Sequence, residues 1–100
     1  MTVFVYAPDL MDRSKVAAAA PSAVLVSRPD RIAAGPGDTV VLDLSRHGAM
    51  EALAGLAAGG ARVIGFASHV DRERADAARA DGCVVLPRSA FFRRLPELLG

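Results

Sequence analysis

The stretch TVVLDLS at Thr39–Ser45 decides the fold of this chain. Its four aliphatic residues surround a single acid, Asp43, and a run this apolar is typical of a strand that is buried on both faces of a parallel sheet. In such sheets the chemistry gathers beyond the carboxyl ends of the strands. Because burying an unpaired carboxylate is costly, we expect Asp43 to point into a solvated crevice or to meet a partner there. Asp43 is therefore where an activity of this chain should be sought.

The rest of the chain alternates similar apolar runs with helix-forming segments. The other runs of β type are Val3–Ala7, Ala23–Ser27, Arg62–Ala67 and Cys83–Leu86. Alternation of this kind is the pattern of right-handed βαβ units. It predicts a three-layer α/β fold in which five parallel strands lie between two layers of helices, with Val3–Ala7 and Thr39–Leu44 as the central strands.

Capping and stop signals place the helices, and proline and glycine set the expected irregularities. Helices are predicted from Asp9 to about Ala20, from Gly48 to Gly59, from Asp71 to Gly82, and from Ser89 onward. The segment Arg28–Asp38 holds two prolines and two glycines, so the second helix of the five should be short or missing. Pro96 should kink or restart the last helix, because it removes a backbone donor.

Composition narrows the class of protein. One hundred residues, 52% of them apolar and 23% charged, suit a single globular domain over residues 1–100. A net charge of +1 gives no overall field for nucleic acid or acidic lipid, so neither is an expected partner. Cys83 is the only cysteine, which excludes an internal disulfide and favours a reducing compartment. With no signal-peptide pattern and no segment apolar enough to span a bilayer, we expect a cytoplasmic protein.

Polar side chains follow the predicted strands, so the topology should gather them at one edge of the sheet. They include Asp9, Asp43, Ser68, His69, Arg88 and Ser89. We expect Asp43, Ser68 and Arg88 to converge in one crevice, with Asp9 across from Asp43.

Three stretches resemble a response-regulator receiver domain, a flavodoxin-like module with strand order 2-1-3-4-5. VVLDLSRHGAMEAL is similar to the family's phosphoacceptor strand, loop and helix. VIGFASHVDRERADAARADG resembles its fourth strand and helix, and VVLPRSAFFRRLPELL its fifth strand and last helix. The likeness is close from Thr39 onward and loose over Val3–Asp12.

The resemblance implies roles for individual residues. Asp43 falls on the phosphoacceptor position, and Ala67, with Ser68 beside it, falls on the hydroxyl residue that follows the phosphoryl group. Arg88 lies near the family's lysine, although that lysine precedes the proline and Arg88 follows Pro87.

The first strand departs from the family pattern. Receivers carry a pair of acids there to hold Mg²⁺, and this chain has Ala7-Pro8 before Asp9. Phosphoryl transfer to a carboxylate relies on a cation to neutralise developing charge. The chain therefore resembles a degenerate receiver, or pseudo-receiver, in which Asp9 and Asp43 alone would hold Mg²⁺ weakly.

Simpler structural roles compete with these assignments. Asp43 equally fits a solvated acid that caps the next helix through its first amides. Ser68 fits a helix cap that acts together with Asp71. His47 and His69 lack the accompanying ligands of a zinc site, so no such site is predicted.

Three functions fit these observations. The first is a non-catalytic signalling module that contacts a protein partner, or a second copy of itself, through the last strand and helix, with a surface made by Phe91, Phe92 and Leu95. Adjacent phenylalanines cannot both face one helix core, so one should be partly exposed. The alternatives are a receiver phosphorylated on Asp43, and an anion- or small-ligand-binding protein that uses Asp9, Ser68, His69, Arg88 and Ser89. An enzyme is not expected, because the sequence holds no nucleophile–base pair or dinucleotide fingerprint.

Overall fold

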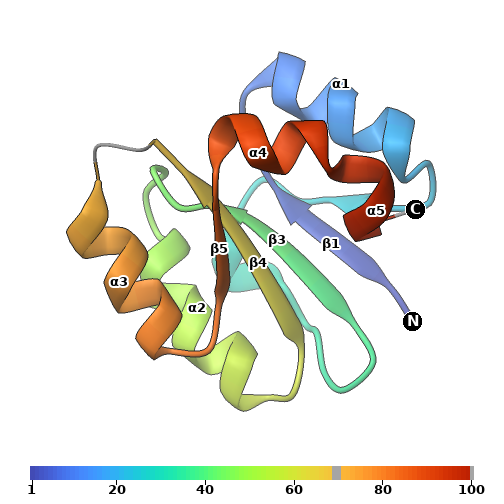
Figure 1. Cartoon of the computed structure of the whole chain (residues 1–100). Coiled ribbons are helices and arrows are strands. Elements are labelled where there is room, and N and C mark those ends of the chain that lie inside the picture. The colour runs from blue at the N-terminus through green and yellow to red at the C-terminus, as the bar shows by residue number, and fades with distance from the viewer. Residues whose placement is uncertain (69–70, 100) are drawn as a thin grey trace.

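Five parallel strands form one sheet in the order β2-β1-β3-β4-β5, with helices between them (Figure 1). The computed structural model describes residues 1–68 and 71–99. The strands are β1 (Val3–Tyr6), β2 (Val24–Leu25), β3 (Thr39–Asp43), β4 (Arg62–Ala67) and β5 (Val84–Pro87). The helices are α1 (Leu10–Ala19), α2 (Ala49–Ala58), α3 (Arg72–Ala80), α4 (Arg88–Arg93) and α5 (Leu95–Leu99), with a 3₁₀ turn η1 (Pro29–Arg31). The predicted flavodoxin-like α/β fold is confirmed, with β1 and β3 inside the sheet.

The helices are interrupted or missing at the places where the proline and glycine residues predict it. Between β2 and β3 the chain makes only the turn η1, so the second helix is indeed missing. The last helix is divided, because α4 ends at Arg93 and α5 starts at Leu95, beside Pro96. The strand β2 is shorter than predicted, with two residues. Within the described ranges, no helix has the length and apolar character needed to cross a membrane.

Two of the helix starts depend on aspartate caps. Asp9 accepts hydrogen bonds from the amides of Met11 at 2.9 Å and Asp12 at 3.1 Å, and Asp71 accepts one from the amide of Arg74 at 3.2 Å. The N-cap residue of α3 is Asp71 and not Ser68, whose backbone carbonyl accepts a hydrogen bond from the Asp71 amide. The helix α4 begins at Arg88, one residue before the predicted start, and Pro87 at its N-cap position makes no side-chain cap.

The core has two halves, one on each face of the sheet. Successive residues of a strand face opposite layers, and all five residues of β3 are buried, which explains its unbroken apolar sequence up to Asp43. Val40 and Leu42 pack in the half that α2 covers, and Val41 packs in the half that α1, α4 and α5 cover (Figure 1).

Gly65 in β4 provides a test of this packing. A Cβ atom added there would lie 2.7 Å from Cδ1 and 2.8 Å from Cγ of the fully buried Leu44. We expect Gly65→Ala to lower the free energy of unfolding by about 1–3 kcal/mol, because the packed leucine must move. Gly55→Ala is the control, since a Cβ there meets nothing within 4 Å and should stabilise the helix α2 by about 0.5–1 kcal/mol. Urea unfolding measures both, and equal effects would contradict this account of β4.

Candidate functional site

Asp43 ends β3 as a buried carboxylate with local partners. Its side chain is 5% exposed. Oδ1 accepts hydrogen bonds from the amide of Ser45 at 3.1 Å and from its hydroxyl at 2.6 Å. Oδ2 accepts one from Nε of Arg46 at 3.4 Å. Of the two expectations for this acid, the solvated crevice is wrong and the partner is correct, because Ser45 and Arg46 hydrogen-bond both oxygens.

Asp43 does not cap the helix that follows it. The residue before α2 is Gly48, which has a φ of 85° and no side-chain cap. Four residues separate Asp43 from this glycine, and the carboxylate is used within them on Ser45 and Arg46. A side chain at Gly48 would also meet Pro29 Cγ at 3.1 Å, so glycine allows η1 to approach the start of α2. The capping interpretation of Asp43 is therefore wrong.

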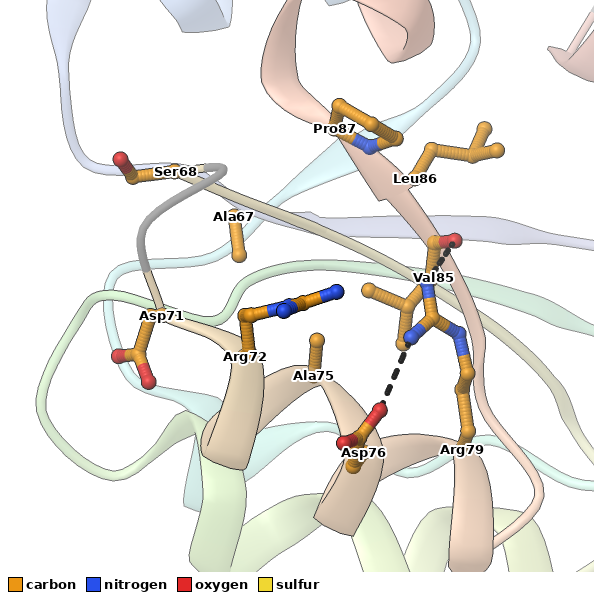
Figure 2. Close-up of a pocket in the computed structure, with 10 residues that line it drawn as sticks. All are labelled: Ala67, Ser68, Asp71, Arg72, Ala75, Asp76, Arg79, Val85, Leu86 and Pro87. Atoms are coloured by element: carbon orange, nitrogen blue, oxygen red, sulfur yellow. Dashed lines mark hydrogen bonds and ion pairs between the residues drawn. The ribbon is translucent and has the colours of Figure 1, made fainter.

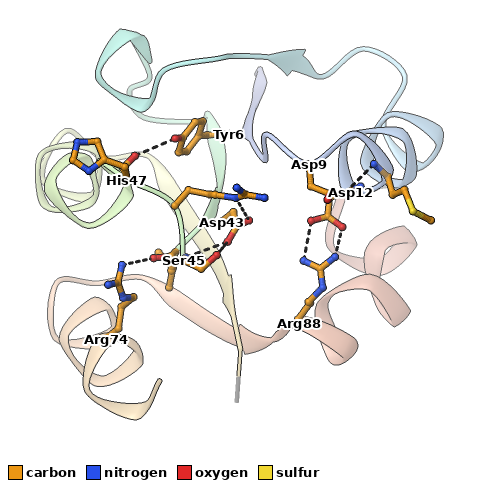
Figure 3. Close-up of polar contacts among 11 residues, drawn as sticks. Tyr6, Asp9, Asp12, Asp43, Ser45, His47, Arg74 and Arg88 are labelled. Carbon is orange, nitrogen blue, oxygen red and sulfur yellow. Dashed lines mark hydrogen bonds and ion pairs between the residues drawn. The ribbon is translucent and has the colours of Figure 1, made fainter. Parts of the chain in front are cut away.

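A second buried carboxylate, Asp12, lies at the same edge and is paired with Arg88 (Figure 3). Arg88 Nη1 donates to Asp12 Oδ2 at 2.8 Å, and Nη2 donates to Oδ1, so the contact is bidentate. The side chain of Asp12 is 1% exposed and that of Arg88 is 48% exposed. The pair joins α1 to α4 across 76 residues of sequence.

The electrostatic setting of Arg88 combines all three acids of this edge with aromatic rings. Hydrogen bonding to Asp12 is the main reason that the pKa of Arg88 is raised, and the charges of Asp43 and Asp9 add to it. The guanidinium carbon lies 5.0 Å from the ring centroid of Phe92 and 5.7 Å from that of Phe66. Arg88 thus reaches the predicted edge of the sheet, where its hydrogen bonds go to Asp12.

The sequence interpretation did not include Asp12 in the site. The available signal was its spacing: Asp12 stands four residues before the fully buried Val16, on the helix face that meets the sheet. An acid in such a stripe requires a cation, and Arg88 follows β5 at the same edge.

Asp9 lies at this edge as an exposed acid. Its Oδ1 caps α1, and the amide of Asp12 is the main reason that its pKa is lowered; the amide of Met11 and the charges of Arg88 and Arg46 act in the same direction. Figure 3 shows Asp9 beside Asp12, with Asp43 across from the Asp12–Arg88 pair.

Arg74, another residue that sequence reasoning missed, ties α3 to the end of β3. Its Nη1 donates to the carbonyl of Leu44 at 2.7 Å, and its Nε donates to Asp71 Oδ2 at 2.9 Å. The segment after β3 is therefore held from α3 as well as by Asp43.

Two other predicted site residues, Ser68 and Ser89, are not part of this carboxylate cluster. Ser68 is exposed and lines a separate hollow between α3 and β5. Ser89 is exposed on the first turn of α4. His69 lies outside the described residues.

The hollow between α3 and β5 has a volume of about 510 Å³ and follows an edge of the sheet (Figure 2). Arg79 donates to the carbonyl of Val85 at 3.4 Å and pairs with Asp76 at 3.3 Å. Arg72 extends from α3 across the hollow toward Val85 (Figure 2). The apolar residues that line it include Ala67, Ala75 and Val85.

A second hollow, of about 590 Å³, lies beyond the carboxyl ends of β1 and β2. The Tyr6 hydroxyl donates to the carbonyl of His47 at 3.0 Å at its edge. Ser27, Arg28 and Glu51 provide polar groups, and Pro29 and Ala52 provide apolar ones.

The described part of the chain offers little for metal or thiol chemistry. Over residues 1–68 and 71–99, no three His, Cys, Asp or Glu side chains are placed to share a metal ion. Burial raises the pKa of the Cys83 thiol to about 11, so this thiol stays protonated near neutral pH.

The structure corrects the predicted partner surface. Phe91 and Leu95 are buried at 0% and 4% exposure, because this face of the last helices packs on the sheet. Phe91 stacks on Phe66 with centroids 4.7 Å apart. Phe92 is half-buried, and its ring centroid lies 5.2 Å from Lys15 Nζ and 5.0 Å from Arg88 Cζ. Of the three predicted surface residues, Phe92 alone keeps part of its ring accessible.

The Asp12–Arg88 pair can be tested against a similar pair at the surface. Arg88→Gln leaves a buried carboxylate without its cation, and we expect it to lower the free energy of unfolding by about 3 kcal/mol. Arg28 also binds an aspartate with two nitrogens, Nε at 3.1 Å and Nη2 at 2.7 Å, but Asp30 is 58% exposed. Arg28→Gln should therefore cost less than about 1 kcal/mol. Chemical denaturation that finds the two variants equally stable would show that Asp12 does not depend on Arg88.

Comparison of the chain with models of known protein families, with curated proteins and with solved structures finds no match. The sheet order is that of flavodoxin-like α/β proteins.

Proposed function

We propose that this chain is a receiver-like signalling module that binds a protein partner and does not accept a phosphoryl group on Asp43. The observation that carries the proposal is the state of the carboxylates at the sheet edge. Asp43 accepts hydrogen bonds from Ser45 and Arg46, and Asp12 accepts hydrogen bonds from Arg88. An edge whose acids already have partners suits a fixed scaffold better than a transfer site.

Phosphoryl transfer would require groups that are used elsewhere. An attacking carboxylate needs an accessible oxygen, and the Asp43 side chain is 5% exposed with both oxygens hydrogen-bonded. Developing charge must be neutralised, and the Arg88 guanidinium is already paired with Asp12. Ala7 and Pro8 contribute no side-chain oxygen for a cation. This arrangement supports the pseudo-receiver hypothesis over the phosphorylatable one.

The same pairing argues against a free anion as the ligand of this edge. An anion at Arg88 would have to displace a bidentate carboxylate that is buried and has that arginine as its cation. Ser89 lies nearby in sequence but is one exposed hydroxyl. The small-anion alternative is therefore the weaker hypothesis.

For the partner we propose the open edge of β5 together with the α3–β5 hollow and Phe92. An edge strand presents backbone groups that a second chain can use. Val84 is 46% exposed on this strand, and the hollow beside it is lined by α3 residues. A protein partner or a second copy of the chain would dock here.

The absence of phosphoryl transfer is directly testable. Incubation with acetyl phosphate and Mg²⁺ should leave the intact mass of the protein unchanged, because the charge of the transferred group would be poorly neutralised. Asp43→Asn is the control for any adduct. A phosphoryl adduct on the wild type that disappears in this variant would establish the phosphorylatable receiver instead.

The proposed docking face can be mapped with a photo-crosslinking residue. Val84 on the edge strand β5 and Val24 on the opposite edge strand β2 are 46% and 43% exposed, which makes them a matched pair. In the native host, a photo-crosslinker at position 84 should give a discrete adduct with a partner or with a second copy, and position 24 should not. Adducts only from position 24, or from neither, would remove this face from the proposal.

A further inference from the structure

The receiver likeness implies a magnesium ion at the carboxyl edge, and the acids there do not fit one while they keep their present partners. Mg²⁺ requires near-octahedral oxygen ligands. Asp9 Oδ1 already accepts two backbone amides, and both oxygens of Asp12 are held by Arg88. The carboxylate of Asp43 is held by Ser45 and Arg46. The positions before Asp9, Ala7 and Pro8, have no side-chain oxygen.

We infer that Arg46 is a built-in counter-ion of Asp43, and that its guanidinium supplies the positive charge which excludes a divalent cation from this edge. The inference rests on the proposed function, because a module that works without phosphoryl transfer has no need of a metal. It adds a physical reason why this edge does not need a metal ion: the charge of Arg46 compensates that of Asp43.

Backbone hydrogen bonds place Arg46 next to Asp43. Its amide donates to the carbonyl of Asp43 at 3.1 Å, and its own carbonyl accepts a hydrogen bond from the amide of Ala49 at 3.3 Å. The turn is therefore fixed on both sides, and Nε lies 3.4 Å from Asp43 Oδ2. The Asp43 side chain is 5% exposed and the Arg46 side chain is 45% exposed, so the arginine is the member of the pair that faces solvent.

The charge balance of the edge depends on this one side chain. Three carboxylates, Asp9, Asp12 and Asp43, face two guanidinium groups, Arg46 and Arg88, which leaves one negative charge. Without Arg46 the balance is two negative charges, and Arg88 remains bound to Asp12. Asp9 and Asp43 would then be the two acids without a hydrogen-bonded cation, which is the charge that attracts a divalent ion.

A matched ion pair separates this role from the general effect of losing an arginine. Arg94 and Glu97 are also three residues apart, at the same Nε–O distance of 3.4 Å, and Arg94 is 46% exposed. The acids differ: Glu97 is 72% exposed and lies outside the edge cluster. Arg94→Gln therefore removes a similar contact without uncovering a buried carboxylate.

The experiment is a titration with MgCl₂ followed by amide NMR of Ser45 and Met11, whose amides bind the Asp43 and Asp9 carboxylates. In Arg46→Gln we expect saturable shifts at both amides, with an apparent affinity at least about tenfold above that of the wild type. Arg46→Lys keeps the charge and should behave like the wild type, as should Arg94→Gln. Arg46→Met, which keeps the aliphatic stem, replaces the glutamine variant if circular dichroism shows that the latter is unfolded.

Three results would overturn the inference: equal Mg²⁺ affinity in the wild type and Arg46→Gln, no gain in either uncharged variant, or a gain in Arg46→Lys that matches Arg46→Gln. These outcomes are separate from the test of the proposed function. Mg²⁺ binding by the wild type without a phosphoryl adduct would overturn the role of Arg46 alone. A phosphoryl adduct on wild-type Asp43 would overturn the proposed function itself.

Discussion

A carboxylate inside a protein needs hydrogen bonds and a compensating charge, and this requirement organises the carboxyl edge of the sheet. Two acids are buried there, at the end of β3 and in the first turns of α1. Each is paired with an arginine whose side chain is about half exposed, and Ser45 adds two hydrogen bonds to Asp43. Guanidinium groups suit this role because they offer several donors in a plane and keep their charge. One of these contacts joins α1 to α4.

The two pairs differ in the distance that they span along the chain. Asp43 and Arg46 belong to a single turn, so this contact can form as soon as the turn does. Asp12 and Arg88 belong to the first and second-last helices, so their contact needs the sheet to be assembled first. The local pair shapes a loop, whereas the long-range pair joins the two ends of the chain on one face of the sheet. Loss of the second should therefore loosen more of the molecule than loss of the first.

Much of the fold was predictable because it depends on patterns of neighbouring residues. The apolar run before Asp43, the aspartate caps and the prolines of Arg28–Asp38 each act locally, and they gave the strands, their parallel arrangement and the missing second helix. The strand order came with the receiver likeness and agrees with the structure.

The site was predictable only in its location. The sequence places Asp9, Asp43 and Arg88 at strand ends, but the choice of Asp12 as the partner of Arg88 depends on the relative rotation of two distant helices. Phe91 and Leu95 were assigned to the surface because the last strand and helix were predicted to contact a partner. The side of α4 and α5 that packs on the sheet is the side that meets Phe66 of β4.

The hydrogen bond from Tyr6 to the carbonyl of His47 has a practical consequence. Tyr6 is the only tyrosine of the chain and there is no tryptophan, so the intrinsic ultraviolet fluorescence of the protein comes mainly from this one buried ring. Its phenol touches the segment that links Asp43 to α2, 41 residues further along the chain. The tyrosine fluorescence of an unlabelled sample should therefore change when that segment moves relative to β1.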